Sequence, residues 1–118
     1  MPRAPDPDAL LPLTPAVLHI LLALAGAGRG GRHGYAVAQD VETLTEGAVR
    51  MGPGTLYGSL QRMLAAGLID ETAADDAGRR YYRTTAFGDR VLARELARLD
   101  RVVTHARARR LLPPAEAT

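Results

Sequence analysis

The segment MGPGTLYGSLQRMLAAGLI, residues 51–69, constrains the fold more than any other part of the chain because it carries both ends of a helix. Gly52 can serve as the N-cap, Pro53 suits the first helical position, and Gly67 is a typical C-terminal stop. The segment therefore predicts a helix over residues 53–66. Its apolar side is formed by Leu56, Leu60, Met63 and Leu64.

The other side of this helix carries small, polar and basic residues and no acid. The spacing i, i+3, i+4 and i+7 places on one face Thr55, Gly58, Ser59 and Arg62. The helix N-terminus adds the unpaired N–H groups of Gly54 and Thr55 and the positive end of the helix dipole, which together suit a phosphate. On spacing alone, an ordinary solvated face explains this pattern as well as a DNA-binding face does.

Two helices are expected before residues 53–66 and a hairpin after them. Thr14 as N-cap and Pro15 at the first position predict a helix that closes near Gly26, with apolar residues on all sides. Apolar residues at helical spacing from Tyr35 to Leu44 predict the second helix. Residues 68–73 and 79–84 indicate two short strands around a turn. This order predicts a mainly α fold with a small β-hairpin, a winged helix-turn-helix.

A long last helix is expected from residue 85 to residue 112. Its apolar residues are spaced four, three, four and three apart, at Leu92, Leu96, Leu99, Val103 and Ala106. At ~1.5 Å per residue such a helix reaches roughly 40 Å, so its far half has little of its own chain to pack on. A second copy is the simplest cover, and we expect a homodimer whose interface also includes Leu18 and Leu22 of the first helix.

The two ends of the chain are expected to be disordered tails. Residues 1–12 hold four prolines, and residues 113–118 read PPAEAT. The expected organisation is therefore a winged-helix domain over residues 13–84 and a dimerisation helix over residues 85–112. The glycine-rich GAGRGGRHG, which lacks the lysine of a phosphate loop and follows a helix, is interpreted as a flexible connector.

Composition narrows the function classes. No long uncharged apolar run, no secretory signal and no cysteine occur, so we expect no membrane contact and a cytoplasmic location. His19, His33 and His105 have no metal-ligand spacing, and we expect no catalysis, no metal and no cofactor. All 15 basic residues are arginine and the pI is about 9.5. A GC-rich genome explains the absence of lysine, so the positions of the arginines matter more than their number.

Arginines cluster in the expected hairpin beside the helix at 53–66. Arg79, Arg80 and Arg83 and the helix offer cations to one surface, as a DNA contact requires. Asp75 and Asp76 lie at the hairpin turn and would repel phosphate if they pointed at DNA. We therefore expect contact from the arginine strand rather than from the tip.

Over residues 13–110 the sequence resembles the PadR family of transcriptional regulators, in its small subgroup with a single C-terminal helix. The resemblance rests on four motifs: HGY at 33–35, GPGTLYGSLQRM at 52–63, GLI at 67–69 and RRYYRTTAFG at 79–88. It implies a dimeric winged helix, usually a repressor, that binds double-stranded DNA at a palindromic operator. Tyr35 and Tyr57 match recurrent tyrosines of the family, Thr55 and Arg62 its DNA face, and Arg80 its basic wing.

The tyrosines, the departures from the family pattern and a possible effector each allow more than one interpretation. Tyr35 fits the core as well as a phosphate contact, whereas Tyr57 is better placed for phosphate. Gly58 and the helix end MLAAG depart from the family pattern, so the mode of binding carries over from the resemblance but base preference does not. Relatives respond to phenolic or cationic hydrophobic compounds, some through a tryptophan that this chain lacks. If a small hydrophobic effector exists, it is expected between the first and last helices of two subunits.

The main alternative is a winged helix that serves as a protein-interaction module without direct DNA binding. The apolar seam of the last helix supports association under both interpretations. The arginines of the helix at 53–66 and of the hairpin discriminate between them, because only DNA binding requires these cations.

Overall fold

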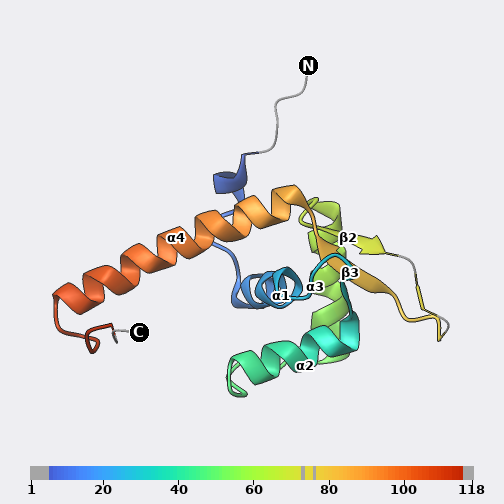
Figure 1. The fold of residues 1–118 in the computed structure, drawn as a ribbon, viewed down its shortest axis with the longest axis horizontal. Coiled ribbons are helices and arrows are strands. Elements are labelled where there is room, and N and C mark those ends of the chain that lie inside the picture. The colour runs from blue at the N-terminus through green and yellow to red at the C-terminus, as the bar shows by residue number, and fades with distance from the viewer. Residues whose placement is uncertain (1–5, 73, 76, 116–118) are drawn as a thin grey trace.

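A computed structural model of the chain describes residues 6–72, 74–75 and 77–115, and it confirms the mainly α fold with a hairpin (Figure 1). The helices are η1 (Pro7–Leu10, a 3-10 helix), α1 (Pro15–Ala25), α2 (Gly34–Leu44), α3 (Pro53–Ala65) and α4 (Ala86–Ala108). The strands are β1 (Arg32–His33), β2 (Ile69–Thr72) and β3 (Tyr81–Thr84), which form one antiparallel sheet in the order β1-β3-β2. We call the hairpin of β2 and β3, with its connecting turn, the wing.

The predicted helix starts are found at α1 and α3. Thr14 Oγ1 accepts a hydrogen bond from the Val17 N–H at 3.3 Å, and Pro15 follows as the first helical residue. Gly52 and Pro53 have the same places at α3. α4 begins after Thr85, whose hydroxyl accepts from the Gly88 N–H at 2.9 Å and donates to the Gly67 carbonyl at 2.6 Å. The start of α4 is thereby fixed to the end of α3.

The core lies where α1, α2, the apolar side of α3, the sheet and the first half of α4 meet. Fully buried side chains come from each of these elements, among them Ile20, Leu21, Leu60, Met63, Ile69, Tyr82 and Val91. Leu92, expected in a dimer seam, belongs to this core at 6% exposure. That expectation was wrong because the first half of α4 is held against α1 and η1, so Leu92 faces its own chain.

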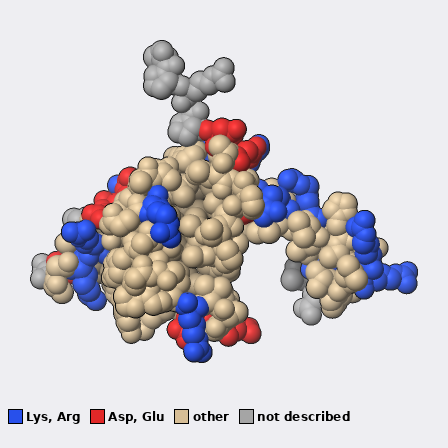
Figure 2. All heavy atoms as spheres, turned by 180° about the vertical axis from the view of Figure 1, so that it is seen from behind, with Lys and Arg blue, Asp and Glu red and all other residues tan. Residues whose placement is uncertain are grey.

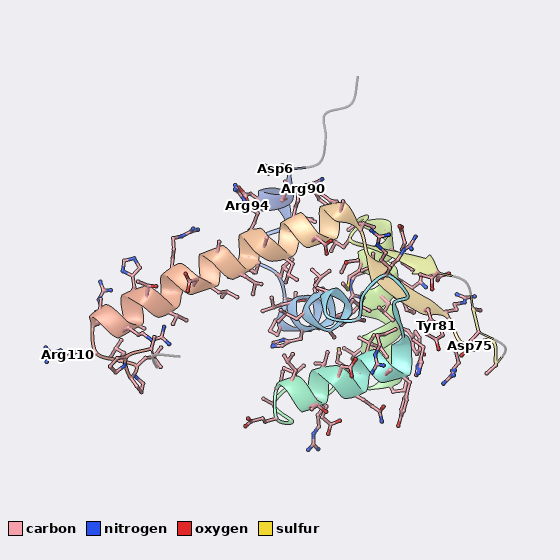
Figure 3. All side chains as sticks on the ribbon, in the orientation of Figure 1. Asp6, Asp75, Tyr81, Arg90, Arg94 and Arg110 are labelled. Atoms are coloured by element: carbon pink, nitrogen blue, oxygen red, sulfur yellow. The ribbon has the colours of Figure 1, made fainter. Side chains whose placement is uncertain are left out.

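The start of the described chain is not the disordered tail that its prolines indicate. Residues 7–10 form η1, capped by Asp6, whose carboxylate accepts from the Asp8 N–H at 3.0 Å. Asp8 binds the Arg94 guanidinium of α4 through two hydrogen bonds of 2.8 and 2.6 Å, and Arg94 lies beside η1 in Figure 3. The expectation failed because it rested on local sequence, whereas this segment is held by α4. Residues 1–5 and 116–118 of the expected tails lie outside the described residues.

Glu95 of α4, a buried residue, also binds the segment before α1. It is 1% exposed, and its carboxylate accepts from the Leu13 N–H at 2.6 Å and from Arg98 Nε. The hydrogen bond from Arg98 is the main reason that the pKa of Glu95 lies below its usual value, and the Leu13 N–H acts in the same direction. Glu95, which lies next to the seam residue Leu96, therefore holds the segment before α1 at Leu13.

The glycine-rich connector also proved more ordered than expected. Arg32 and His33 form β1, paired with Tyr82 and Tyr81 of β3. Gly31 precedes β1 with a φ of +74°, and a Cβ at this position would lie 2.2 Å from the Tyr82 carbonyl oxygen. Only glycine fits there, because the backbones touch and the conformation is left-handed.

The far half of α4 extends away from the body (Figure 1). Val102 is 55% exposed and Leu96 40% exposed, and three seam residues are half-buried: Leu99, Val103 and Ala106. On α1, Leu18 and Leu22 are also half-buried. α4 ends at Ala108 instead of residue 112, with Arg109 as its C-cap. The dimer seam remains a prediction that this single chain does not test.

Candidate nucleic-acid interface

The N-terminus of α3 is open to solvent. Gly52, its N-cap, provides no side-chain hydrogen bond, and the first backbone bond of the helix is from the Leu56 N–H to the Gly52 carbonyl at 3.0 Å. The N–H groups of Gly54 and Thr55, both exposed, precede that bond and so have no partner within the helix. Unpaired N–H groups at the positive end of a helix dipole are a ready contact for an anion.

The exposed face of α3 differs from the predicted one. Thr55 and Arg62 are exposed as expected, but Ser59 is 1% exposed and its hydroxyl oxygen accepts from Arg62 Nη2 at 3.3 Å. The placement of Ser59 on the DNA face was wrong because α3 packs on α1, α2 and β2 and therefore buries a wider arc than one leucine stripe. Ser59 lies about 40° from Met63 around the helix, inside that arc.

The true centre of the exposed face contains Gly54, Gly58 and Gln61. At about 100° per residue, these positions lie opposite the buried Leu56, Leu60 and Met63. Thr55 and Arg62 lie on one flank of the face, and Tyr57, which is 47% exposed, lies on the other. Gln61 was not among the residues expected at this site, although its helical position four residues after Tyr57 is a signal that would have found it.

The two tyrosines lie beside the N-terminus of α2. Tyr35 is 66% exposed, which excludes the interpretation of this residue as core. The ring of Tyr57 passes over Gly34, where an added Cβ would lie 3.1 Å from the ring and from the hydroxyl oxygen. Gly34 therefore makes room for Tyr57. With His33, Gln61 and the wing arginines, the two tyrosines line a hollow of about 330 Å³ between α2, α3 and the wing.

The wing arginines have internal partners at accessible positions. Arg80 Nη1 lies 3.6 Å from Glu71 Oε1, and Arg79 Nε donates to Asp75 Oδ2 at 2.7 Å. The side chains of both arginines are more than half exposed, so each guanidinium can still meet a phosphate. Exposed ion pairs of this kind are weak and exchange easily for a phosphate contact.

Asp75 organises the turn of the wing. Its carboxylate accepts from the backbone N–H groups of Ala77 and Arg79, both at 3.0 Å, and from the Tyr81 hydroxyl at 3.3 Å. These bonds, above all the one from the Arg79 N–H, hold the pKa of Asp75 below its usual value. In Figure 3 Asp75 and Tyr81 lie together at the wing, at the opposite end of the molecule from Arg110. Asp75 is thus occupied within the wing; Asp76 lies outside the described residues.

His33 connects the wing to α2. Its Nδ1 caps α2 by accepting from the Ala36 N–H at 3.3 Å, and its ring meets Tyr81 edge-on at a centroid distance of 5.6 Å. Arg79 Nη1 lies 3.4 Å from the other ring nitrogen. The position of the wing relative to α2 and α3 is therefore fixed by side chains as well as by the strand pairing of β1 and β3.

Basic residues lie at both ends of the molecule as well as on its body (Figure 2). Seen from behind, Figure 2 shows blue side chains at the end that carries the wing and others at the far end of α4. The second group belongs to Arg107, Arg109 and Arg110, which are exposed. Elsewhere some arginines are paired with acids, as in the two hydrogen bonds of 2.9 and 2.8 Å from Arg32 to Asp40. The wing and the exposed face of α3 together form the surface that we call the α3–wing face.

Membrane-spanning helices and metal clusters are not found in the described part of the chain. None of its helices has the length and apolar character that crossing a membrane requires. Within the same residues, no group of three or more histidine, aspartate or glutamate side chains is arranged to hold a metal ion.

Comparison with known proteins gives a family and a fold. The family model of the transcriptional regulator PadR-like family matches residues 21–94. A PadR family transcription regulator from Clostridium difficile R20291 is similar in structure, with a TM-score of 0.66 at 20% identity, over 80% of this chain and 97% of that one. A transcriptional regulator from Clostridium thermocellum gives 0.67 at 20% identity, over 79% and 87%. No protein of curated function matches in sequence.

MepR of Staphylococcus aureus, a transcription regulator of the multidrug efflux pump MepA, shares the fold as well. Its TM-score is 0.67 at 19% identity, over 92% of this chain and 74% of that one. A mutant of MepR bound to an oligodeoxyribonucleotide gives a TM-score of 0.62. At these identities the likeness concerns the winged-helix architecture alone.

Proposed function

The chain belongs to the PadR-like family of transcriptional regulators, and from this premise we propose that it represses transcription by binding a palindromic operator as a homodimer. A transcriptional regulator of this kind binds DNA. The α3–wing face is the proposed contact, with α3 in the major groove and the wing on the adjacent backbone. Regulators of this family act by binding, and no catalytic step is assigned to the chain.

The observation that carries this proposal is the convergence of phosphate-binding groups on one face. The unpaired N–H groups of Gly54 and Thr55 begin α3, and Arg62 follows on its exposed flank. Arg79 and Arg80 project from the wing across a hollow that Tyr35 and Tyr57 also line. Backbone N–H groups, guanidinium groups and tyrosine hydroxyls are the donors that position proteins on the phosphates of a duplex.

The homodimer rests on the far half of α4. Val102 is exposed on this half and Leu96 just before it, and Leu99, Val103 and Ala106 lie between and beside them with part of their surface still accessible. A second α4 would cover this surface, and two-fold symmetry would present two α3–wing faces to one duplex. A palindromic operator follows from that symmetry. A small hydrophobic effector between α1 and α4 of two subunits remains a prediction.

Binding to DNA upstream of the protein's own gene tests the proposal. A fluorescence anisotropy titration with that duplex is run at two salt concentrations, with the mass of the free protein determined by sedimentation. We expect a dimer whose affinity falls steeply with salt. Arg62→Ala and Arg80→Ala should each reduce the salt slope by roughly one for every phosphate that the arginine binds. Affinity and slope that are unchanged in both variants would favour the protein-interaction module instead.

A further inference from the structure

We propose that Gln61 is the residue of α3 that reads base sequence, and that it recognises an adenine in each half of the operator. This inference rests on the proposed function and adds the chemistry of its specificity. It follows from three observations on α3: where Gln61 lies, what surrounds it, and what its neighbour Arg62 does.

Gln61 occupies the centre of the exposed face of α3. The other central positions are Gly54, Gly58 and Ala65, so Gln61 carries the only side chain there with hydrogen-bonding groups. Thr55 and Arg62 lie on one flank of the helix. A helix that enters the major groove presents its centre to the base edges and its flanks to the phosphates.

The two glycines have no internal reason to lack a side chain. A Cβ at Gly54 would meet no atom within 4 Å, and a Cβ at Gly58 would meet only Arg62 Nη1, at an ordinary 3.5 Å. Glycine within a helix is less stable than alanine, so these positions weaken α3 without any gain in packing. The lack of side chains at these two positions instead suits contact with DNA. It lets the α3 backbone approach the major groove closely and brings the short Gln61 side chain within reach of the bases.

The guanidinium of Arg62 is held against α3. Its Nη2 donates to Ser59 Oγ at 3.3 Å, and its Nη1 lies beside Gly58. Part of its hydrogen-bonding capacity is therefore used within the helix, and the rest is left for phosphates. Gln61 is exposed, and its amide offers one acceptor and two donors. This set matches adenine, whose N6 donates and N7 accepts in the major groove.

The test is selection of binding sites from a pool of randomised duplexes by the purified full-length protein. The wild type is compared with Gln61→Ala and Gln61→Glu, and with Gln39→Ala as a matched control. Gln39 is exposed on α2, where it lines one hollow with Glu42, Glu46 and Arg50 and another with Tyr35 and Tyr57, so it borders the proposed phosphate contacts but is not on α3. Because Gln61 and Gln39 are both exposed, circular dichroism melting should show all variants folded.

We expect the wild type to select sites with one preferred adenine in each half. In Gln61→Ala the preference for adenine over the other bases at this position should fall by roughly 5- to 140-fold, the equivalent of one good bidentate base contact. The preferences at the other positions of the site should be unchanged. Gln61→Glu should shift the preference at the same position to cytosine, because a carboxylate accepts from cytosine N4. Gln39→Ala should select the wild-type sequence.

Two results would overturn the inference in distinguishable ways. Selection of the same sequence by wild type and Gln61→Ala, or the same loss in Gln39→Ala, would remove Gln61 from base recognition while DNA binding stands. Failure of the wild type to enrich any sequence would overturn the proposed function together with this inference.

Discussion

Glycine has opposite surroundings in two regions of the molecule. At the start of α4, a Cβ on Gly88 would lie 2.0 Å from the Leu68 carbonyl oxygen, so the backbones of α4 and the segment before β2 are in direct contact. On the exposed face of α3, a Cβ on Gly58 would meet only Arg62 at an ordinary distance, and a Cβ on Gly54 would meet nothing within 4 Å. The fold therefore requires glycine at position 88, but it does not require glycine at positions 54 and 58.

This difference separates a region built for stability from a region built for contact. The start of α4, with η1 and the buried Glu95, is closed by packing and internal hydrogen bonds. The α3–wing face holds unpaired helix N–H groups and loosely paired arginines. Substitutions in the first region should change folding, and substitutions in the second should change DNA binding. Four predictions test this division, from the largest expected effect to the smallest.

The largest effect is expected for Gly88→Ala. The added methyl group overlaps a backbone oxygen that cannot turn away, so α4 must shift from β2. We expect a loss of about 3 kcal/mol in the free energy of unfolding, measured by urea denaturation. Gly58→Ala is the matched control, and equal stability of the two variants would contradict the division.

Glu95→Ala should also destabilise the closed region, by about 1.5–3 kcal/mol, because the Leu13 N–H and Arg98 lose a charged acceptor. The native pKa of Glu95 is lowered, so its contribution is complete above the unfolded value of about 4.3 and is lost as the pH falls through the native pKa. Thermal melts between neutral and acid pH should therefore fall less steeply for Glu95→Gln than for wild type. Glu42→Gln, at an exposed position, should follow the wild-type profile.

Gly58→Ala should change stability and DNA binding in opposite directions. Alanine stabilises a helix interior by roughly 0.5–1 kcal/mol relative to glycine, and the new methyl group meets only the movable Arg62 guanidinium. The same methyl group would hold α3 away from the base edges, so DNA affinity should fall several-fold. Denaturation and anisotropy on one preparation check both signs; a variant that is more stable and binds as tightly as wild type would contradict the prediction.

Asp75→Ala should change DNA affinity least, but the direction of the change distinguishes two roles of Asp75. Removal of a negative charge near DNA should strengthen binding if Asp75 acted only by repulsion. Because Asp75 instead holds Ala77, Arg79 and Tyr81 in the wing turn, we expect weaker binding. Asp70→Ala removes the same charge from exposed β2 without these bonds, and it should bind at least as well as wild type. Tighter binding by Asp75→Ala would contradict the proposed role.

The sequence predicted those parts of the fold that are specified by neighbouring residues. Thr14 with Pro15, and Gly52 with Pro53, are local signals, and both helices begin there. The hairpin was predicted from two short segments on either side of a turn, and β2 and β3 lie there. β1 was missed because its two residues become a strand only by pairing with β3, some fifty residues later. The ordered η1 was missed for the same reason, since its partner Arg94 lies in α4.

The candidate site was predicted in outline, and its details depended on packing. Thr55 and Arg62 lie on the exposed side of α3 as expected, because one helical period is enough to place them. Ser59 was misplaced because the width of the buried arc depends on how many elements surround α3. The role of Asp75 could not be read from the sequence, because a carboxylate at a turn looks the same whether it faces solvent or binds the turn.

Hydrogen exchange of the α3 amides with and without operator DNA tests the central claim most directly. In the free protein the N–H groups of Gly54 and Thr55 have no helical partner and should exchange quickly. Bound to the duplex selected from the random pool, they should be protected, together with residues 77–81 of the wing, while residues 42–50 should be unaffected. Protection confined to residues 42–50 or to the end of α4, with Gly54 and Thr55 still exchanging quickly, would contradict the account.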